Sequence, residues 1–398
     1  MPVPTVTLPV STGAPPARGA PHVSSREPTA LLRPLAELSP AERAAWARLC
    51  ERSAPPNPFW HPDLVEAAAG LLFDRERAAL LVAVQGREWV GCLPIELVLR
   101  RPRCVVRALV HPYCFNATPL VAGARPAAVA RALASALVEL RPAAVWLPDL
   151  VDCRASRALL SGLLAQGDYQ VVFERRWERS LLSRAVASSR PADRLARKLR
   201  AELRRRLRRL EEYSQGTVAA VLRSPDRATL QTILTLEASG WKGSAGSAIA
   251  CDQRHVTFFT TVLRRFAARD ALFLVTLEAA GRPVAFASAL AAGGQLFGFK
   301  RGYDAELARF APGRLLDLEF ERLFLETRRE QLVDSCCSVD NDAMAPLWPD
   351  RRAMRSLLLA RRGLAGSAAQ LAFSAVRCAR RAADVRGQRR ARPCPRPR

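Results

Sequence analysis

A short segment around Pro312 has residue types suited to binding a phosphate group. Pro312 lacks an N–H, which costs nothing at the first position of a helix, and Gly313 lets the backbone approach a ligand closely. The N–H groups of a helix start attract anions, and neighbouring Arg side chains can add charge-assisted contacts. Pro-Gly is equally common at the start of a helix that binds nothing, so both interpretations stay open. The residues expected to bind such a phosphate-bearing cofactor are Phe299, Lys300, Arg309, Pro312, Gly313 and Arg314.

The chemistry that fits this segment is acyl transfer from a CoA thioester to an amine or hydroxyl. The thioester carbonyl needs a donor where the oxyanion develops, and a backbone N–H of the third meander strand, around Phe297–Lys300, is placed for this. The acceptor must lose a proton, so a base is needed, and each carboxylate in reach could instead be a solvated or capping group. The residues expected in catalysis are Glu237, Lys242, Tyr303 and Asp304, and those expected to contact the acceptor are Trp241, Asp334 and Asp340.

The loop from 237 to 247 is the most unusual short segment. It is rich in Gly and Ser yet carries Trp241 and Lys242. Trp side chains in such loops usually pack or bind something, so Trp241 either anchors the loop to the core or faces a ligand. Lys242 is one of only three Lys residues, and it can pair with an acidic or phosphate group.

The elements around these residues predict a mixed α/β fold. Residues 271–340 read as a meander of three strands, a helix that starts at Pro312, and a further strand. A similar order of helices, meander, helix and strand occurs earlier in the chain. Ser39, Pro40 and Glu42 mark the start of its first helix. The sequence therefore predicts a central mixed sheet flanked by helices, built twice in tandem.

The chain divides on this basis into four parts. We expect a disordered leader at 1–29, an N-terminal domain without catalytic function at 30–182, a catalytic C-terminal domain at 190–355, and a basic tail at 356–398. Helical periodicity predicts a helix over 357–383 within that tail. The leader has no apolar core of a signal peptide, and no run of apolar residues is long enough to span a membrane.

The net charge of +24 is concentrated in particular segments rather than spread evenly. Residues 351–398 hold 14 Arg and one acidic residue, and residues 194–209 form a basic helix with a Leu stripe. Fifty-eight of 61 basic residues are Arg, a ratio typical of genomic base-composition bias. No nucleotide-binding glycine motif, zinc-ligand spacing or DNA-reading motif occurs, so we expect no metal and no sequence-specific nucleic-acid binding.

The segment 190–355 resembles the GNAT acyltransferase superfamily, and within it the CelD/BcsL-type acetyltransferases of bacterial cellulose and exopolysaccharide biosynthesis. The resemblance rests on the order of five motifs: KLRAELRRRLRRL, LEASGWKGSAGSA, GRPVAFASAL, LFGFKRGYDAELARFAPGRLLDLEFER and DSCCSVDNDAMAPLWPDRR. It implies tandem GNAT-like domains with an inactive first copy. The usual diphosphate signature of the superfamily, [QR]-x-x-G-x-[GA], is absent, and Ala311-Pro312-Gly313-Arg314 stands in its place.

The resemblance implies a cytoplasmic acetyltransferase that uses acetyl-CoA or another acyl-CoA and a sugar, polysaccharide precursor or other small molecule as acceptor. Two alternatives stay open. One is a transferase similar to the Fem type, which would take its acyl group from aminoacyl-tRNA and which the basic helix at 194–209 fits. The other is a non-catalytic scaffold that docks through residues 356–398 on an anionic membrane or an acidic partner.

Overall fold

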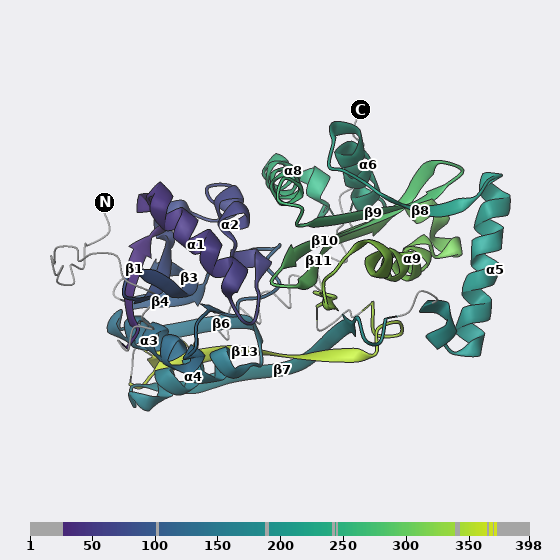
Figure 1. Ribbon diagram of the computed structural model, residues 1–398. Coiled ribbons are helices and arrows are strands. Elements are labelled where there is room, and N and C mark those ends of the chain that lie inside the picture. The colour runs from purple at the N-terminus through teal and green to yellow at the C-terminus, as the bar shows by residue number, and fades with distance from the viewer. Residues whose placement is uncertain are drawn as a thin grey trace, which may run out of the picture.

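The computed structural model describes residues 27–100, 103–187, 191–240, 243, 246–338, 343–363, 366–368 and 370–371. Within them the chain forms one continuous mixed sheet of 13 strands, with helices on its faces (Figure 1). No helix among these residues has both the length and the apolar character needed to cross a membrane. The prediction of a mixed α/β fold is confirmed.

The first half runs from β1 to β7. Its elements are β1 (Thr29–Pro34), η1 (Leu35–Glu37), α1 (Pro40–Arg52), η2 (Pro58–Trp60), α2 (Pro62–Ala68), η3 (Arg75–Arg77), β2 (Ala78–Gln85), β3 (Glu88–Arg100), β4 (Arg103–Ala108), β5 (Leu120–Val121), α3 (Pro126–Glu139), β6 (Ala144–Val151), α4 (Arg154–Ala165) and β7 (Tyr169–Ser183).

The second half repeats the plan. Its elements are η4 (Pro191–Arg194), α5 (Arg197–Ser214), β8 (Val218–Leu222), α6 (Arg227–Ala238), η5 (Ile249–Cys251), α8 (Gln253–Ala267), β9 (Leu272–Ala279), β10 (Arg282–Ala292), β11 (Gln295–Tyr303), η6 (Ala305–Phe310), α9 (Pro312–Thr327), β12 (Leu332–Asp334) and β13 (Asp350–Arg361).

The strand pairing shows that the two halves are copies of one design. The sheet order is β1-β2-β3-β4-β6-β13-β7-β12-β11-β10-β9-β8, and β5 pairs with β3 off this path. Each half has an antiparallel meander followed by a helix and a strand that returns parallel to the last meander strand. The parallel pairs are β4 with β6 in the first half and β11 with β12 in the second. The predicted tandem arrangement is therefore present.

Local sequence signals explain where the helices begin. The Ser39 Oγ accepts the N–H of Glu42 at 3.2 Å, and the Glu42 carboxylate accepts the N–H of Ser39 at 2.9 Å, which is a capping box for α1. Helix α9 begins at Pro312, as predicted. It has no side-chain cap, because its N-cap residue is Ala311 in the left-handed region at φ 53°.

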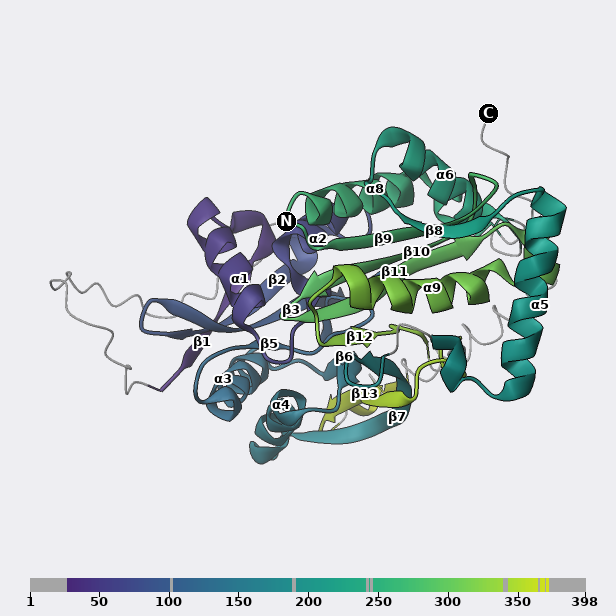
Figure 2. The same cartoon turned by 45° about the vertical axis from the view of Figure 1, so that its right-hand side comes forward.

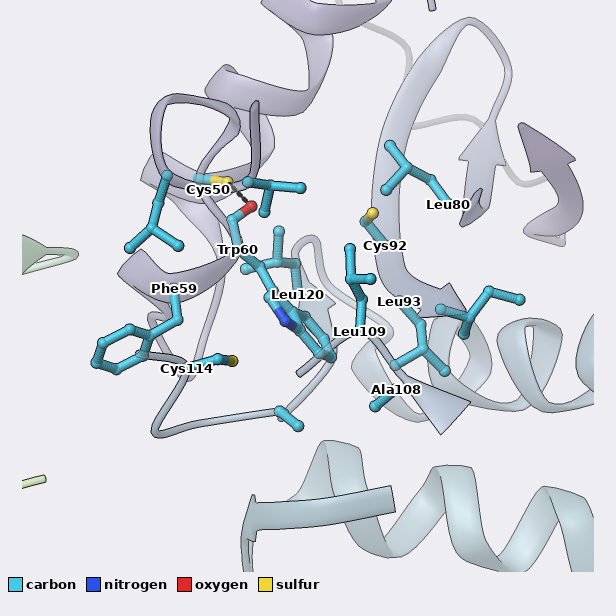
Figure 3. Close-up of a cluster of buried hydrophobic side chains, with 14 of the residues drawn as sticks. Cys50, Phe59, Trp60, Leu80, Cys92, Leu93, Ala108, Leu109, Cys114 and Leu120 are labelled. Carbon is cyan, nitrogen blue, oxygen red and sulfur yellow. Dashed lines mark hydrogen bonds between the residues drawn. The ribbon is translucent and has the colours of Figure 1, made fainter. Parts of the chain in front are cut away.

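Two clusters of buried apolar side chains hold the sheet and its helices together. The larger fills the first half, where the Cys50 thiol donates to the Trp60 carbonyl at 3.4 Å among apolar side chains (Figure 3). This cluster continues into the second half through Phe297 and Phe299 of β11. The smaller cluster lies on the other face of the second half, under α9 and α5. Because the larger cluster spans both halves, they pack as one body.

Strand β13 ties the end of the described chain to its beginning. It lies between β6 and β7, antiparallel to both, so residues after 350 pair with strands of the first half (Figure 1). The helix predicted over 357–383 is therefore wrong at its start, because residues through Arg361 are strand. Leu357, Leu358 and Leu359 are all buried, and a strand with both faces covered reads as a continuous apolar run. The predicted domain boundary at 355 falls inside this strand.

Replacing Leu357 by Ala tests how much the inserted strand contributes. Leu357 is fully buried, so we expect the substitution to lower the free energy of unfolding by about 2–5 kcal/mol. Urea denaturation followed by circular dichroism measures this, with exposed Ala353→Ser on the same strand as the control. A loss below about 1 kcal/mol for Leu357→Ala would show that the strand contributes little to the sheet.

Candidate functional site

A cavity of about 260 Å³ lies where the parallel strands β11 and β12 diverge. The strands pair at only three positions, the last being Phe297 with Asp334, and then separate. Side chains from β10, β11, α9 and the segment after β12 line the space. The lining residues used below are Ser288, Gly298, Phe299, Lys300, Arg301, Asp317, Phe320, Cys336, Met344 and Trp348. The open end of a parallel strand pair is a common place for ligands in α/β proteins.

Gly298 permits the close approach of the strands at the base of the cavity. A Cβ on this residue would lie 2.6 Å from the carbonyl oxygen of Ser335, a distance that real Cβ atoms do not reach. Just beyond it, the register between β10 and β11 shifts, pairing Ser288 with Lys300 and Ala289 with Gly298. Phe299 is therefore the extra residue of a β-bulge, a feature that often redirects side chains near functional sites.

Lys300 is held by the bulge and by aromatic rings. Its backbone N–H donates to the Ser288 Oγ at 3.2 Å, and the Ser288 hydroxyl donates back to the Lys300 carbonyl at 3.0 Å. Its Nζ lies 4.4 Å from the centroid of Tyr113 and 5.9 Å from that of Phe115. Both rings belong to the first half, and cation–π contacts of this kind favour the charged ammonium. The Lys300 side chain is thus held by the first half, although its backbone belongs to a strand that lines the second-half cavity.

The start of α9 lies beside the cavity, because Arg301 of the lining contacts Gly313, while Asp317 and Phe320 further along α9 line the space itself. The N–H groups of Arg314 and Leu315 donate to the Ala311 carbonyl at 2.9 and 3.2 Å, and Pro312 has no N–H. The N–H of Gly313 has no carbonyl of its own helix to bond, as at any helix start. A Cβ on Gly313 would lie 3.5 Å from the Tyr303 ring, an ordinary contact, so the glycine is not required for packing.

A buried ion pair crosses this side of the cavity. Arg301 pairs with Asp317 and also donates to the Gly313 carbonyl at 3.3 Å. Asp317 is 4% exposed, and burial raises the pKa of its carboxyl despite Arg301 and Arg314 nearby. Its Oδ2 is buried without a hydrogen-bond partner. A buried acceptor left unsatisfied is costly, so it marks a place where a ligand N–H or O–H would fit.

Asp334 is at the centre of a buried ion cluster at the end of β12. Arg179 of β7 and Arg352 of β13 donate to its carboxylate, each at 2.7 Å, and the N–H of Cys336 donates at 2.9 Å. Burial alone would raise the pKa of Asp334, but the two guanidinium groups outweigh it and hold the pKa below its usual range. The carboxylate is fully buried and joins three strands, so its contacts are structural.

A loop of the first half covers the far face of β11. Tyr113 in this loop is 2% exposed, and its hydroxyl lies 2.7 Å from the Nδ1 of His255 on α8. Burial raises the pKa of Tyr113, so its hydroxyl stays protonated at neutral pH. Burial also lowers the pKa of His111 to about 3, so this neighbouring ring is neutral.

The equivalent opening in the first half is filled by this same loop. Beyond their paired residues, β4 and β6 also diverge, but the N–H of Ala117 donates to the Asp149 carbonyl at 3.1 Å. The Val151 N–H donates to the Thr118 Oγ1 at 2.7 Å. Segment 109–119 thus occupies the place that is a cavity in the second half.

The structure brings together only part of the predicted site. Phe299, Lys300, Tyr303, Pro312 and Gly313 lie at or beside the cavity. Trp241, Lys242 and Asp340 lie outside the described residues, so their predicted roles stay predictions.

Other predicted residues have local partners. The Glu237 carboxylate accepts the N–H of Ile249 at 2.7 Å, and Asp304 caps η6 while pairing with Arg282 at 3.0 Å. The Arg309 guanidinium stacks on Tyr213 at 4.9 Å, and Arg314 donates to the Ala343 carbonyl. Arg309 thus lies against Tyr213, whereas Arg314 stays near the cavity, which Ala343 lines.

The sequence reasoning missed the packing role of Gly298, the pairing of Arg301, and the residues Asp317 and Tyr113. An Arg and an Asp spaced by sixteen residues carry no local signal, and Tyr113 reaches the site only through packing of the two halves. Gly298 inside an apolar strand was a usable signal, because a strand glycine often marks a bulge or a close backbone approach. Among the described residues, no group of three or more His, Cys, Asp or Glu side chains is arranged to hold a metal ion.

The family comparison supports this location. Residues 197–332 match the family model described as acetyltransferase (GNAT) domain. This segment is therefore similar to a GNAT acetyltransferase domain. The match covers α5 through the first residue of β12, and so includes the bulge at Phe299 and the start of α9. The matched segment thus lies in the half with the open cavity. No curated protein matches the chain.

Solved structures resemble both halves together. FemX has a TM-score of 0.54 at 10% identity, covering 83% of this chain and 98% of its own. A conserved protein of unknown function from Bacteroides thetaiotaomicron has a TM-score of 0.51 at 15% identity, covering 82% and 99%. L-PGS from Bacillus licheniformis has a TM-score of 0.50 at 12% identity, covering 85% and 96%. At these identities the likeness concerns the fold alone.

Replacing Asp334 by Asn distinguishes a structural role from a role in binding acceptor. The substitution leaves two buried guanidinium groups without their counter-ion, so we expect about 3–5 kcal/mol less stability at pH 7 in urea denaturation. Because the folded pKa of Asp334 is depressed, its contribution is present above pH of about 4 and is lost as pH falls through the folded pKa. Exposed Asp168→Asn is the control. A loss of unfolding free energy in Asp334→Asn that is small, or that does not change with pH, would contradict the structural role.

Proposed function

We propose that this protein is an acyl-CoA-dependent acyltransferase whose donor lies in the cavity between β11 and β12. The acceptor would be an amine or hydroxyl of a sugar, a polysaccharide precursor or another small molecule, in the cytoplasm. One observation carries the proposal: β10, β11 and α9 of the segment that matches the GNAT domain line the cavity, and Arg301 of this lining reaches the uncapped first turn of α9. The assignment to exopolysaccharide biosynthesis remains a proposal from the sequence resemblance.

Donor binding would use the two walls of the cavity. The diphosphate would accept the N–H of Gly313, where the positive end of the α9 dipole also lies. The arm that leads to the thioester would run along the cavity, and the unsatisfied Oδ2 of Asp317 would accept one of its N–H groups. Arg314 would have to leave the Ala343 carbonyl before it could contact a phosphate.

The transfer itself would take place at the bulge. The acceptor's lone pair attacks the thioester carbonyl carbon, the C–S bond breaks, and the sulfur leaves as a thiolate that takes up the proton lost by the acceptor. The N–H of Phe299, which the register with β10 bypasses, would stabilise the oxyanion. The Lys300 ammonium would have to leave the Tyr113 and Phe115 rings before it could assist. Tyr303, at the exposed end of β11, would lie on the acceptor side. Glu237 and Asp304 stay candidates only if their present partners are displaced.

The first half would have no donor site of its own. Its equivalent strand opening is occupied by segment 109–119, which leaves no room for a thioester arm. Its part would be to hold Lys300 between Tyr113 and Phe115. The proposed inactive first copy therefore has a role in shaping the site.

Gly313→Asp tests the donor site. The added carboxylate would repel the diphosphate, so we expect affinity for acetyl-CoA in calorimetric titration to fall at least about tenfold. Gly313→Ala is the matched control, since its Cβ meets only an ordinary 3.5 Å contact and should leave affinity within about threefold. Equal affinities for the three proteins would exclude the α9 start as the phosphate site, and absence of binding to acetyl-CoA or longer acyl-CoAs would overturn the donor class.

A second donor class, an aminoacyl-tRNA as in a Fem-like transferase, fits the same cavity. What favours it is that Arg309 contacts Tyr213 and Arg314 donates to the Ala343 carbonyl, so each guanidinium would have to leave a present partner to bind a diphosphate. An ester-linked aminoacyl group needs the carbonyl site at the bulge but no diphosphate site. If this class is right, a mixture of aminoacyl-tRNAs should be retained at ~150 mM salt while acetyl-CoA is not bound. Loss of the charged tRNAs at that salt concentration would argue against it.

A further inference from the structure

One face of helix α5 presents mainly basic side chains, with Ala201 among them and Glu212 beyond the last one. Six exposed cations recur at helical spacing along this face and fall within an arc of ~140° at 3.6 residues per turn. These residues, which we call the α5 stripe, are Arg197, Lys198, Arg204, Arg205, Arg208 and Arg209. The stripe extends ~18 Å along the helix axis.

The α5 stripe is not neutralised by the protein. Within the described ranges, none of its six side chains has an ion pair, whereas Arg200 and Arg206 on the flanks pair with Asp193 and Glu202. The opposite face of α5 packs Leu203 and Leu210 into the smaller apolar cluster. The helix is therefore fixed to the domain and directs an unbalanced positive charge outward at the edge of the molecule (Figure 1).

The composition of the stripe indicates what would bind there. A helix that enters a membrane surface needs a free apolar face, and the apolar face of α5 is already buried. A protein interface needs an apolar centre, which the stripe lacks. A chain of phosphates needs neither, because closely spaced cations replace its counter-ions.

An exposed aromatic platform follows the stripe at the C-terminal end of α5. Tyr213 is 60% exposed, with the Arg309 guanidinium 4.9 Å from its ring centroid and the Phe310 ring 5.3 Å away. An exposed ring supported by a guanidinium is the kind of surface on which an unpaired nucleobase stacks. Arg309 and Phe310 belong to η6, which leads through Ala311 directly into α9 (Figure 2).

We propose that the α5 stripe and the Tyr213 platform bind single-stranded RNA, with phosphates along the stripe and a terminal base on Tyr213. This arrangement brings the terminal ribose toward the start of α9 and the cavity, where its hydroxyls can carry or receive an acyl group. That last step rests on the proposed acyl transfer, whereas RNA binding does not. The proposed surface contacts the phosphate backbone of the RNA and the face of one base. It therefore needs no motif that reads base sequence.

Fluorescence anisotropy with a short single-stranded RNA labelled at its 5′ end tests the stripe, using full-length protein without acyl donor. Neutralising six phosphates gives a slope of log K against log salt of about −4 for single strands. Arg204→Glu with Arg208→Glu should weaken binding more than tenfold and reduce the slope by about 1.5. The control, Arg48→Glu with Arg154→Glu, makes the same charge change at exposed positions of α1 and α4. Equal losses in both double variants would overturn the proposal.

Tyr213→Ala tests the platform separately. Loss of one stacked base should weaken RNA binding about 5- to 150-fold while leaving the salt slope unchanged. Binding to heparin, which has charge but no bases, should not respond to this substitution. If Tyr213→Ala leaves RNA affinity unchanged, or if phosphatidylglycerol vesicles bind through the stripe while RNA does not, the assignment to RNA is wrong. Titration of the same proteins with acetyl-CoA reports separately on the cavity.

Discussion

The buried carboxylate of Asp334 fixes the arrangement on which the rest of the molecule depends. It receives a guanidinium from β7 and another from β13, and so joins β12 of the second half to two strands of the seam between the halves. A carboxylate this deeply buried is tolerable only with such partners. Because β12 is held by this cluster at its final residue, the chain after it must turn away from β11. The cavity begins at that point.

The two copies of the fold illustrate how one backbone plan supports different roles. Both contain a parallel strand pair that opens at one end, which leaves backbone groups unsatisfied unless something fills the gap. In the first half the chain fills it with its own segment 109–119, and that segment continues across to contact β11 through Tyr113. In the second half the gap stays open. The filled copy thereby contacts Phe299, a residue that lines the cavity of the open one.

Local signals made much of the fold predictable, while the site depended on distant contacts. The cap at Ser39, the glycine turns of the meander and the start of α9 at Pro312 all follow from rules that operate within a few residues. The run from Leu357 to Leu359 was misread as helix because a strand covered on both faces has no alternation to distinguish it. Some pairs form only after the sheet is assembled, so no spacing in the sequence predicts them. Examples are Arg301 with Asp317 and Lys300 with Tyr113.

The position of β13 has a consequence for how the protein is made. During synthesis the N-terminal half leaves the ribosome long before residues 350–361 do. In the finished sheet these residues form β13, which lies between β6 and β7. A nascent chain up to β7 therefore has two apolar strand edges that must either remain open or pair with each other in a non-native way. Chaperones that shield exposed strand edges would bind the nascent chain while β6 and β7 lack β13 between them. The translation speed over the second half would set how long these two edges stay open.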